Sequence, residues 1–347
     1  MAELESLTER ERRVLAAVIE TYIATAEPVG SQTVARRTAL GISPASIRST
    51  MSELEAKGFL FHPHTSAGRI PTDQGYRVYV NAMVSQQPPD ARSREALEAE
   101  LSGAGANTTS EEMLRRAAQV LGILTQELGV AVAPALDEIV LERIDLVSVA
   151  AERLLLVFNL RSGTMRTIYV RVPGVIDPAQ LDEVTRLLNE RLAGLTLREI
   201  RATLTDRLRD AATSPEASEL LDIILAEGEG VFDVQEPVES VMLGSAAMLA
   251  EQPEFASNER MRSLLTLTDR REALREALAM RRRDGIVVTI GGEHGDPGLA
   301  GFTLVTSTYH RGGATGVIGV LGPTRMPYDK IIGLVEHTGR LVEGLLQ

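Results

Sequence analysis

The sequence predicts a multidomain α+β protein in which a helical head precedes an antiparallel sheet that carries a mainly helical insertion. The chain has 347 residues, which is more than one ordinary core accommodates. Apolar residues recur at the helical period between residues 8 and 80. Strand-like runs occur at 139–172, give way to helical patterns, and return at 286–321. These observations favour two or three domains, one of them interrupted in sequence.

The composition is that of an ordinary soluble protein, with 44% hydrophobic and 24% charged residues. No apolar run approaches the roughly 20 residues that a membrane-spanning helix needs, and the first residues lack the apolar stretch of a secretory signal. Cysteine is absent, which excludes disulfides and thiolate metal sites. We therefore expect a cytoplasmic protein without membrane contact.

Charge is unevenly distributed along the chain. The formal net charge is -12, yet residues 1–81 hold nine Lys/Arg and nine Asp/Glu, so the acidic excess lies in residues 82–347. Within the head, residues 36–77 hold six basic and three acidic side chains. An acidic body behind a locally basic head would repel DNA except at one face, so the pattern permits nucleic-acid binding there.

Two helices are predicted at the start of the head. Thr8 followed by Glu11 is a capping-box pattern, and the helix that it opens carries an apolar stripe from Val14 to Ile23. Pro28 and Gly30 end this element. Ser31 then begins a short second helix that reaches Arg36 and Arg37.

A third helix and a hairpin complete the head. Ser43–Pro44 is a strong helix start, and Ile47, Met51 and Leu54 fall on one face of the helix that follows. Small and hydroxylic side chains occupy the opposite face, and Gly58 ends the helix. Residues 59–61 and 70 read as the two strands of a hairpin, before Thr72 opens another helix. This order predicts a winged helix-turn-helix.

The head would contact DNA through three groups of side chains. The third helix would enter the major groove, the start of the second would touch phosphates, and the hairpin would act as the wing. The expected DNA-binding residues are Ser31, Gln32, Thr33, Ser43, Ala45, Ser46, Arg48, Ser49, Ser52, His64, Thr65, Ser66 and Arg69. A winged helix that binds only protein is the alternative for this segment. His62 and His64 have metal-like spacing but no third ligand nearby, so we interpret them as wing residues.

The remainder of the chain contains a linker and a body. Residues 85–109 have a hinge-like composition around a short charged helix. Strands are expected at 139–149, 154–160, 167–172, 286–290, 302–309 and 316–321. Helices are expected at 110–128, 178–210, 216–226, 240–250, 259–283 and 328–346. The two groups of strands suggest one antiparallel sheet carrying a helical insertion.

No catalytic, metal or cofactor site is expected in the body. The glycines at 312–316 are not followed by the Gly-Lys-Ser/Thr of a phosphate-binding loop. Glu293, His294 and Asp296 could gather for acid–base or metal chemistry, but a polar loop is the simpler interpretation. No Gly-x-Ser-x-Gly elbow is present. The sequence therefore predicts a regulator and not an enzyme.

Residues 43–80 resemble the HrcA family of bacterial heat-shock repressors. The segment PHTSAGRIPT at 63–72, followed by GYR, carries most of this resemblance, and a second match lies at 316–336 in GVIGVLGPTRMPYDKIIGLVE. The family usually has Ile-Arg-Asn in the recognition helix, whereas this chain has Ile47, Arg48 and Ser49. A serine at position 49 can still bond a base edge or a phosphate.

The resemblance implies a domain order and a mode of action. It implies a winged helix-turn-helix at 1–84, a linker at 85–109, a GAF-like domain at 110–176 and 259–347, and an inserted dimerisation domain at 177–258. It further implies a homodimer that represses chaperonin and DnaK-type chaperone genes by binding the CIRCE inverted repeat, with its activity maintained by the GroE chaperonin. A small-molecule-gated regulator that uses the GAF-like domain as its sensor is the alternative function.

Overall fold

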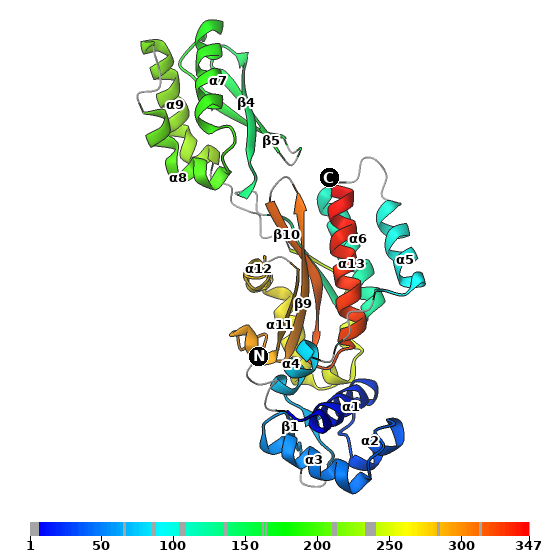
Figure 1. Cartoon of the computed structure of the whole chain (residues 1–347). Coiled ribbons are helices and arrows are strands. Elements are labelled where there is room, and N and C mark those ends of the chain that lie inside the picture. The colour runs from blue at the N-terminus through cyan, green and yellow to red at the C-terminus, as the bar shows by residue number, and fades with distance from the viewer. Residues whose placement is uncertain are drawn as a thin grey trace. The chain divides into compact units, whose positions relative to one another are not determined.

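The structure is a computed structural model of the chain (Figure 1). It describes residues 7–64, 67–82, 84, 88–103, 109–134, 138–161, 163, 165–209, 214–232, 241–282, 285–311 and 314–346. The chain divides into two compact units. Unit 1 comprises Met1–Ala131, Val241–Thr308 and Ile318–Val342, and unit 2 comprises Val132–Ser240, Tyr309–Val317 and Glu343–Gln347.

Unit 1 begins with a head of helices and a short hairpin. Its elements are α1 (Glu9–Thr25), α2 (Ser31–Arg37), α3 (Pro44–Ala56), β1 (Leu60–Phe61), β2 (Ile70–Pro71) and α4 (Asp73–Ala82). The predicted helix starts are confirmed, because Thr8 and Glu11 form a reciprocal capping box and Ser43 caps α3 ahead of Pro44. β1 and β2 pair antiparallel, as the hairpin prediction requires.

The core of the head fixes the orientation of α3. One face of α3 packs against α1, and the side chains at this contact expose no surface: Val14, Leu15, Val18, Ile47, Met51 and Leu54. Burying such side chains stabilises a fold by about 1.5–3 kcal/mol each. Because α3 is held along one face, its opposite face must point away from the core.

The body of unit 1 is built on a five-stranded sheet with the order β7-β3-β10-β9-β8. Its strands are β3 (Leu128–Val132), β7 (Val241–Leu243), β8 (Ile286–Ile290), β9 (Phe302–Arg311) and β10 (Ala314–Pro323). Five longer helices accompany the sheet: α5 (Ala91–Ser102), α6 (Ser110–Thr125), α11 (Asn258–Asp269), α12 (Arg271–Ala279) and α13 (Tyr328–Leu346). Figure 1 shows α6 and α13 on one side of β9 and β10, with α11 and α12 on the other.

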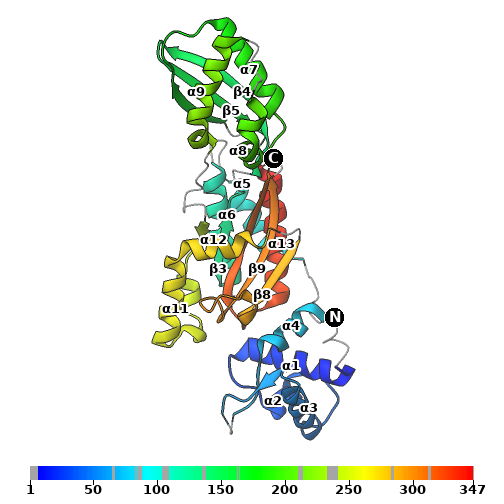
Figure 2. The same ribbon diagram turned by 90° about the vertical axis from the view of Figure 1, so that its left-hand side faces the viewer.

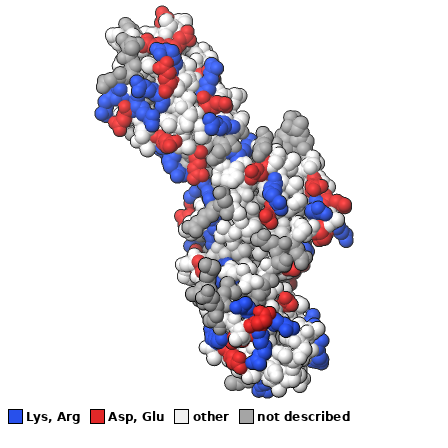
Figure 3. Space-filling model, in the orientation of Figure 1, with Lys and Arg blue, Asp and Glu red and all other residues white. Residues whose placement is uncertain are grey.

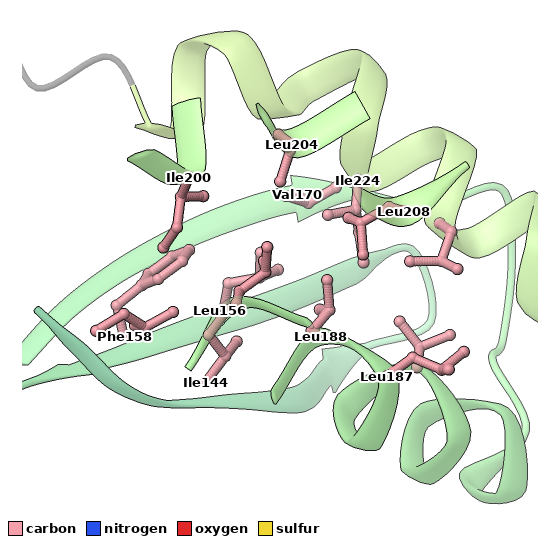
Figure 4. Packing of buried hydrophobic residues seen from close by; sticks show 14 of the residues in the cluster. Ile144, Leu156, Phe158, Val170, Leu187, Leu188, Ile200, Leu204, Leu208 and Ile224 are labelled. Atoms are coloured by element: carbon pink, nitrogen blue, oxygen red, sulfur yellow. The ribbon is translucent and has the colours of Figure 1, made fainter. Parts of the chain in front are cut away.

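Unit 2 is a three-stranded antiparallel sheet packed against helices. The strands β4 (Leu141–Ala150), β5 (Arg153–Leu160) and β6 (Met165–Arg171) follow one another in the order β4-β5-β6. The helices are α7 (Pro178–Leu192), α8 (Leu197–Leu208) and α9 (Pro215–Phe232). Figure 4 shows Leu156 and Phe158 of the sheet pointing toward Leu188 and Ile200 of the helices. The helices therefore bury one face of this sheet.

The prediction of one continuous sheet is wrong. The strands at 141–171 form their own sheet, and the strands at 286–323 pair instead with β3 and β7. The cause lies in β5, where Leu154, Leu156, Phe158 and Leu160 alternate on one face and bury it against α7–α9. Because α7–α9 cover that apolar face, the three strands form a core with these helices.

The structure also corrects other element predictions and contains a strand, β3, that was not predicted. Every residue of β3 is buried, so the sequence lacks the alternation that marks a half-exposed strand. The segment expected as a helix at 240–250 contains β7 followed by the short helix α10 (Ala247–Ala250). The helix expected at 259–283 is divided into α11 and α12 at Arg270.

Leu156→Ala should lower the free energy of unfolding of unit 2 by about 2–5 kcal/mol, because the change leaves a cavity at a side chain that is 1% exposed. Urea denaturation followed by circular dichroism measures this loss. Glu142→Ala is the matched control, since it changes an exposed side chain of the same sheet and should cost under about 1 kcal/mol. Equal losses would contradict the assignment of the two faces.

Candidate nucleic-acid interface

The outward face of α3 carries five of the side chains that the sequence assigns to DNA binding. Ser43, at the N-cap, and Ala45, Arg48, Ser49 and Ser52 are all exposed, while Ser46 is half-buried. In Figures 1 and 2, α1 and α4 lie between the five-stranded sheet and the helices α2 and α3. The face is therefore directed away from the body of unit 1.

The remaining predicted residues lie on α2 and on the hairpin. Gln32 is exposed, and Ser31 and Thr33 are half-buried on the first turn of α2. His64 is exposed beside β1. Thr65 and Ser66 lie outside the described residues.

Several hydroxyls on α3 are already hydrogen-bonded within the head, those of Ser49 and Ser52 among them. The Ser49 hydroxyl donates to Glu53 Oε1 at 3.3 Å. The Ser52 hydroxyl donates to the carbonyl of Arg48 at 3.1 Å and accepts from Arg69 Nη2 at 2.7 Å. A base or phosphate that bonds Ser52 would have to compete with these partners, whereas the Arg48 side chain has no ion pair among the described residues.

Arg69 faces inward and not toward the surface of the wing. It is only 9% exposed, and its Nε donates to Glu55 Oε2 at 3.1 Å. Its main chain exchanges two hydrogen bonds of 2.9 Å with Val29, which ties the hairpin to the segment before α2. Gly68 permits this approach, because a Cβ at that position would meet the Val29 carbonyl carbon at 2.5 Å. Arg69 thus positions the hairpin against α3, which differs from the direct DNA contact expected of it.

Glu55, in the last turn of α3, is a site residue that the sequence analysis missed. Its two oxygens receive different partners, with His62 Nδ1 at 2.5 Å from Oε1 and Arg69 at Oε2. The hydrogen bond with His62 and the nearby Arg69 charge hold the pKa of Glu55 below its usual value. The available signal was a pair of glutamates, Glu53 and Glu55, near the end of a helix that has a single arginine. Among the described residues, no group of three or more His, Asp or Glu is arranged to hold a metal ion.

Arginines of α2 and α3 are exposed on the head. Arg36, Arg37 and Arg48 are exposed, and Arg36 Nε donates to the carbonyl of Gln32 at 3.3 Å. Lys57 forms an ion pair within the head, because its Nζ lies 2.6 Å from the carboxylate of the buried Glu11. In Figure 3, Lys and Arg side chains reach the surface of the head, with Asp and Glu side chains beside them. Such cations can neutralise phosphates.

This mixed α/β chain is similar to known proteins in fold and in sequence. A crystal structure of a hypothetical protein has the same overall fold, with a TM-score of 0.59 at 24% identity, over 98% of this chain and 99% of that one. The family model described as "HrcA protein C terminal domain" matches residues 111–332. The chain is 34% identical to the heat-inducible transcription repressor HrcA of Chlorobium chlorochromatii, over 96% of each protein. It is 37% identical to that of Chlorobaculum tepidum, over 98% of each.

The chain belongs to the HrcA family, whose members are transcription repressors and not enzymes. The family model begins at residue 111, so the kinship of the head rests on relatives that align over nearly the full chain. Among the described residues, the helices lack the combination of length and apolar character that crossing a bilayer requires.

Arg69→Ala should lower the free energy of unfolding by about 1–3 kcal/mol, because Glu55 and Ser52 lose a charged donor in a partly buried position. Thermal denaturation measures the change. Arg37→Ala removes an exposed cation from the same head and should cost less than about 0.5 kcal/mol. Unchanged stability in Arg69→Ala would mean that the guanidinium is free for DNA.

Proposed function

We propose that this chain is a heat-inducible repressor whose head is a winged helix-turn-helix that binds the CIRCE inverted repeat. The observation that carries the proposal is the division of α3 into a fully buried face and an outward face of small, hydroxylic and basic side chains. The names of the relatives, heat-inducible transcription repressor, support the regulatory role. Repression would follow from blocking access of the polymerase, and a cytoplasmic location fits this role.

Each group of side chains has a proposed role in DNA binding. Ala45 and Ser49 are small enough to let α3 lie close to base edges in the major groove. Arg48 is the candidate for a bidentate contact with a guanine. Around it, Ser43, Ser46 and Ser52 of α3 and Ser31, Gln32 and Thr33 of α2 would lie near phosphates. His64, Thr65 and Ser66 would place the wing, while Arg69 holds its base from inside.

We further propose that two copies of the chain pair through unit 2. The helices cover one face of its sheet, and the other face exposes a row of large apolar side chains. Val147 is 46%, Tyr169 62% and Met165 69% exposed, and Leu155 lies between Val147 and Tyr169 in the register. Aromatic and methionine side chains are enriched in protein interfaces. A second copy related by a twofold axis would bury this row and present two heads to an inverted repeat.

This proposal changes the expected domain boundaries. The inserted dimerisation domain would include β4–β6 together with α7–α9, and would therefore begin before residue 177. The GAF-like domain would be built on the five-stranded sheet of unit 1. Maintenance of the repressor by the GroE chaperonin, which the family resemblance implies, completes the proposed regulation.

The function is tested by titrating the full chain onto a CIRCE-type inverted repeat and onto a scrambled duplex at physiological salt. We expect specific retardation of the repeat, strengthened by added GroE chaperonin. Equal affinity for both duplexes, from folded protein, would contradict the assignment of the head. Specific binding that does not change when chaperonin is added would support the operator assignment. It would also favour regulation of DNA binding by a small molecule.

Arg48→Ala should weaken operator binding by about 1–3 kcal/mol while changing affinity for random DNA much less, because a base contact is lost. Fluorescence anisotropy on both duplexes measures the two affinities. Arg92→Ala, which removes an exposed cation of α5, controls for total charge and should leave both unchanged. Equal weakening on both duplexes would reassign Arg48 to a phosphate.

Tyr169→Asp should weaken self-association at least about tenfold, because a buried aromatic anchor is replaced by a charge at the proposed interface. Sedimentation velocity over a range of concentrations measures this shift. Ala179→Asp introduces the same charge at an exposed position on α7 and should leave the association intact. A dimer that withstands Tyr169→Asp would remove the sheet face from the interface.

A further inference from the structure

One contact between the head and the body of unit 1 is made by the turn that follows β8. This turn is the short 3₁₀-helix η5 (Gly291–His294). Asp73, the first residue of α4, accepts a hydrogen bond of 2.9 Å from the Gly292 amide. Arg77, one turn further along α4, donates from Nε to Glu293 Oε1 at 2.7 Å. The position of α4 against the body therefore depends on where this turn lies.

His294, the last residue of the turn, ties it to the rest of the body through both ring nitrogens. Its Nδ1 lies 2.9 Å from Arg281 Nη2, and its Nε2 lies 3.1 Å from the carbonyl oxygen of Phe302. A guanidinium only donates hydrogen bonds, so Nδ1 must accept, and Nε2 must carry the proton that bonds Phe302. The two bonds can therefore exist together only while the imidazole is neutral.

Arg281 makes a proton on this imidazole unfavourable. It lies two residues after α12 and is only 7% exposed. Its other hydrogen bonds go to the carbonyl of Ala277 and, at 3.0 Å, to the hydroxyl of Thr289. Among the described residues, no carboxylate pairs with it. A proton on His294 Nδ1 would thus set a second cation and a second donor against a buried charge that lacks a counter-ion.

The elements around His294 carry charges of both signs. The segment after α12 contributes the Arg281 cation, the loop of His294 itself contributes the carboxylates of Glu293 and Asp296, and β9 contributes the Phe302 carbonyl. Burial and the Arg281 charge lower the pKa of His294 to about 4, although the carbonyl and the two carboxylates oppose this shift. The imidazole is therefore neutral near pH 7.

We propose that neutral His294 is a positioning residue for the head, and that protonation of its imidazole loosens the attachment of α4 to the body. The proton breaks the bond with Arg281, and the turn that ends at His294 then shifts. Asp73 and Arg77 lose their partners on that turn, whereas the bond of Arg325 to the end of α1 is unaffected. An effect on operator affinity would rest on the proposed DNA binding, but the loosening itself does not.

The direction of the pH effect follows from the pKa of His294 in the two arrangements. The pKa is about 4 while the turn is in place and returns to its ordinary value near 6.5 once the turn has shifted. The loosened arrangement binds the proton first, so the attachment is strongest above about pH 6.5 and weakens as the pH falls toward 4. Between pH 7 and pH 5 the equilibrium constant for attachment should fall at least about tenfold.

Hydrogen exchange of the full chain in the absence of DNA measures this equilibrium. The Gly292 amide donates to Asp73, so its protection reports how often the attachment opens. This protection, corrected for the intrinsic exchange rate at each pH, should fall at least about tenfold from pH 7 to pH 5. The amides of β10 report the core of the sheet and should keep their protection. Constant protection of Gly292, or an equal loss in β10, would overturn the proposal.

Variants of His294 separate the proton from the structural role of the side chain. His294→Gln offers an acceptor to Arg281 and a donor to Phe302 but takes up no proton, so the protection of Gly292 should be equal at pH 7 and pH 5. His294→Ala removes both bonds and should lower the protection at pH 7 to a value that no longer depends on pH. His310→Gln removes an exposed histidine of β9 and should behave as the parent does. A pH dependence that persists in His294→Gln would overturn the proposal and would leave the proposed DNA binding untouched.

Discussion

Arg325, two residues after the end of β10, donates from Nη1 to the carbonyl of Ile23 at 2.7 Å, in the last turn of α1. Helix ends leave such carbonyls without partners, so the body of unit 1 satisfies a group that the head cannot satisfy alone. The same guanidinium holds Glu254 through two further bonds. A second arginine, Arg77 of α4, pairs with Glu293 and donates to the carbonyl of Val288 at 2.6 Å. These two arginines attach the head to the five-stranded sheet.

The direction of α3 follows from this attachment. α1 is held by Arg325 and shares its core with α3, so the outward face of α3 is set by side chains that lie far from it in sequence. The link between Glu55 and Arg69 then fixes the hairpin beside that face.

Local signals in the sequence predicted the head well. The capping box at Thr8 and the Ser43–Pro44 start depend on neighbouring residues, and both are present. Non-local features escaped prediction. β3 is buried on both faces and reads like any short apolar run. The pairing of Arg77 with Glu293 joins residues separated by 216 positions, so no local pattern predicts it. The inward direction of the Arg69 side chain depends on its hydrogen bond to Glu55, which the local sequence pattern also does not predict.

We propose that two heads, joined through unit 2, bind one inverted repeat. The most direct measurement counts the copies of the chain on a duplex that carries both half-sites, by sedimentation equilibrium, and compares it with a duplex that carries one. The account predicts two copies on the full repeat and an affinity for the half-site at least about tenfold weaker. A single copy on the full repeat, with equal affinity for the half-site, would contradict it.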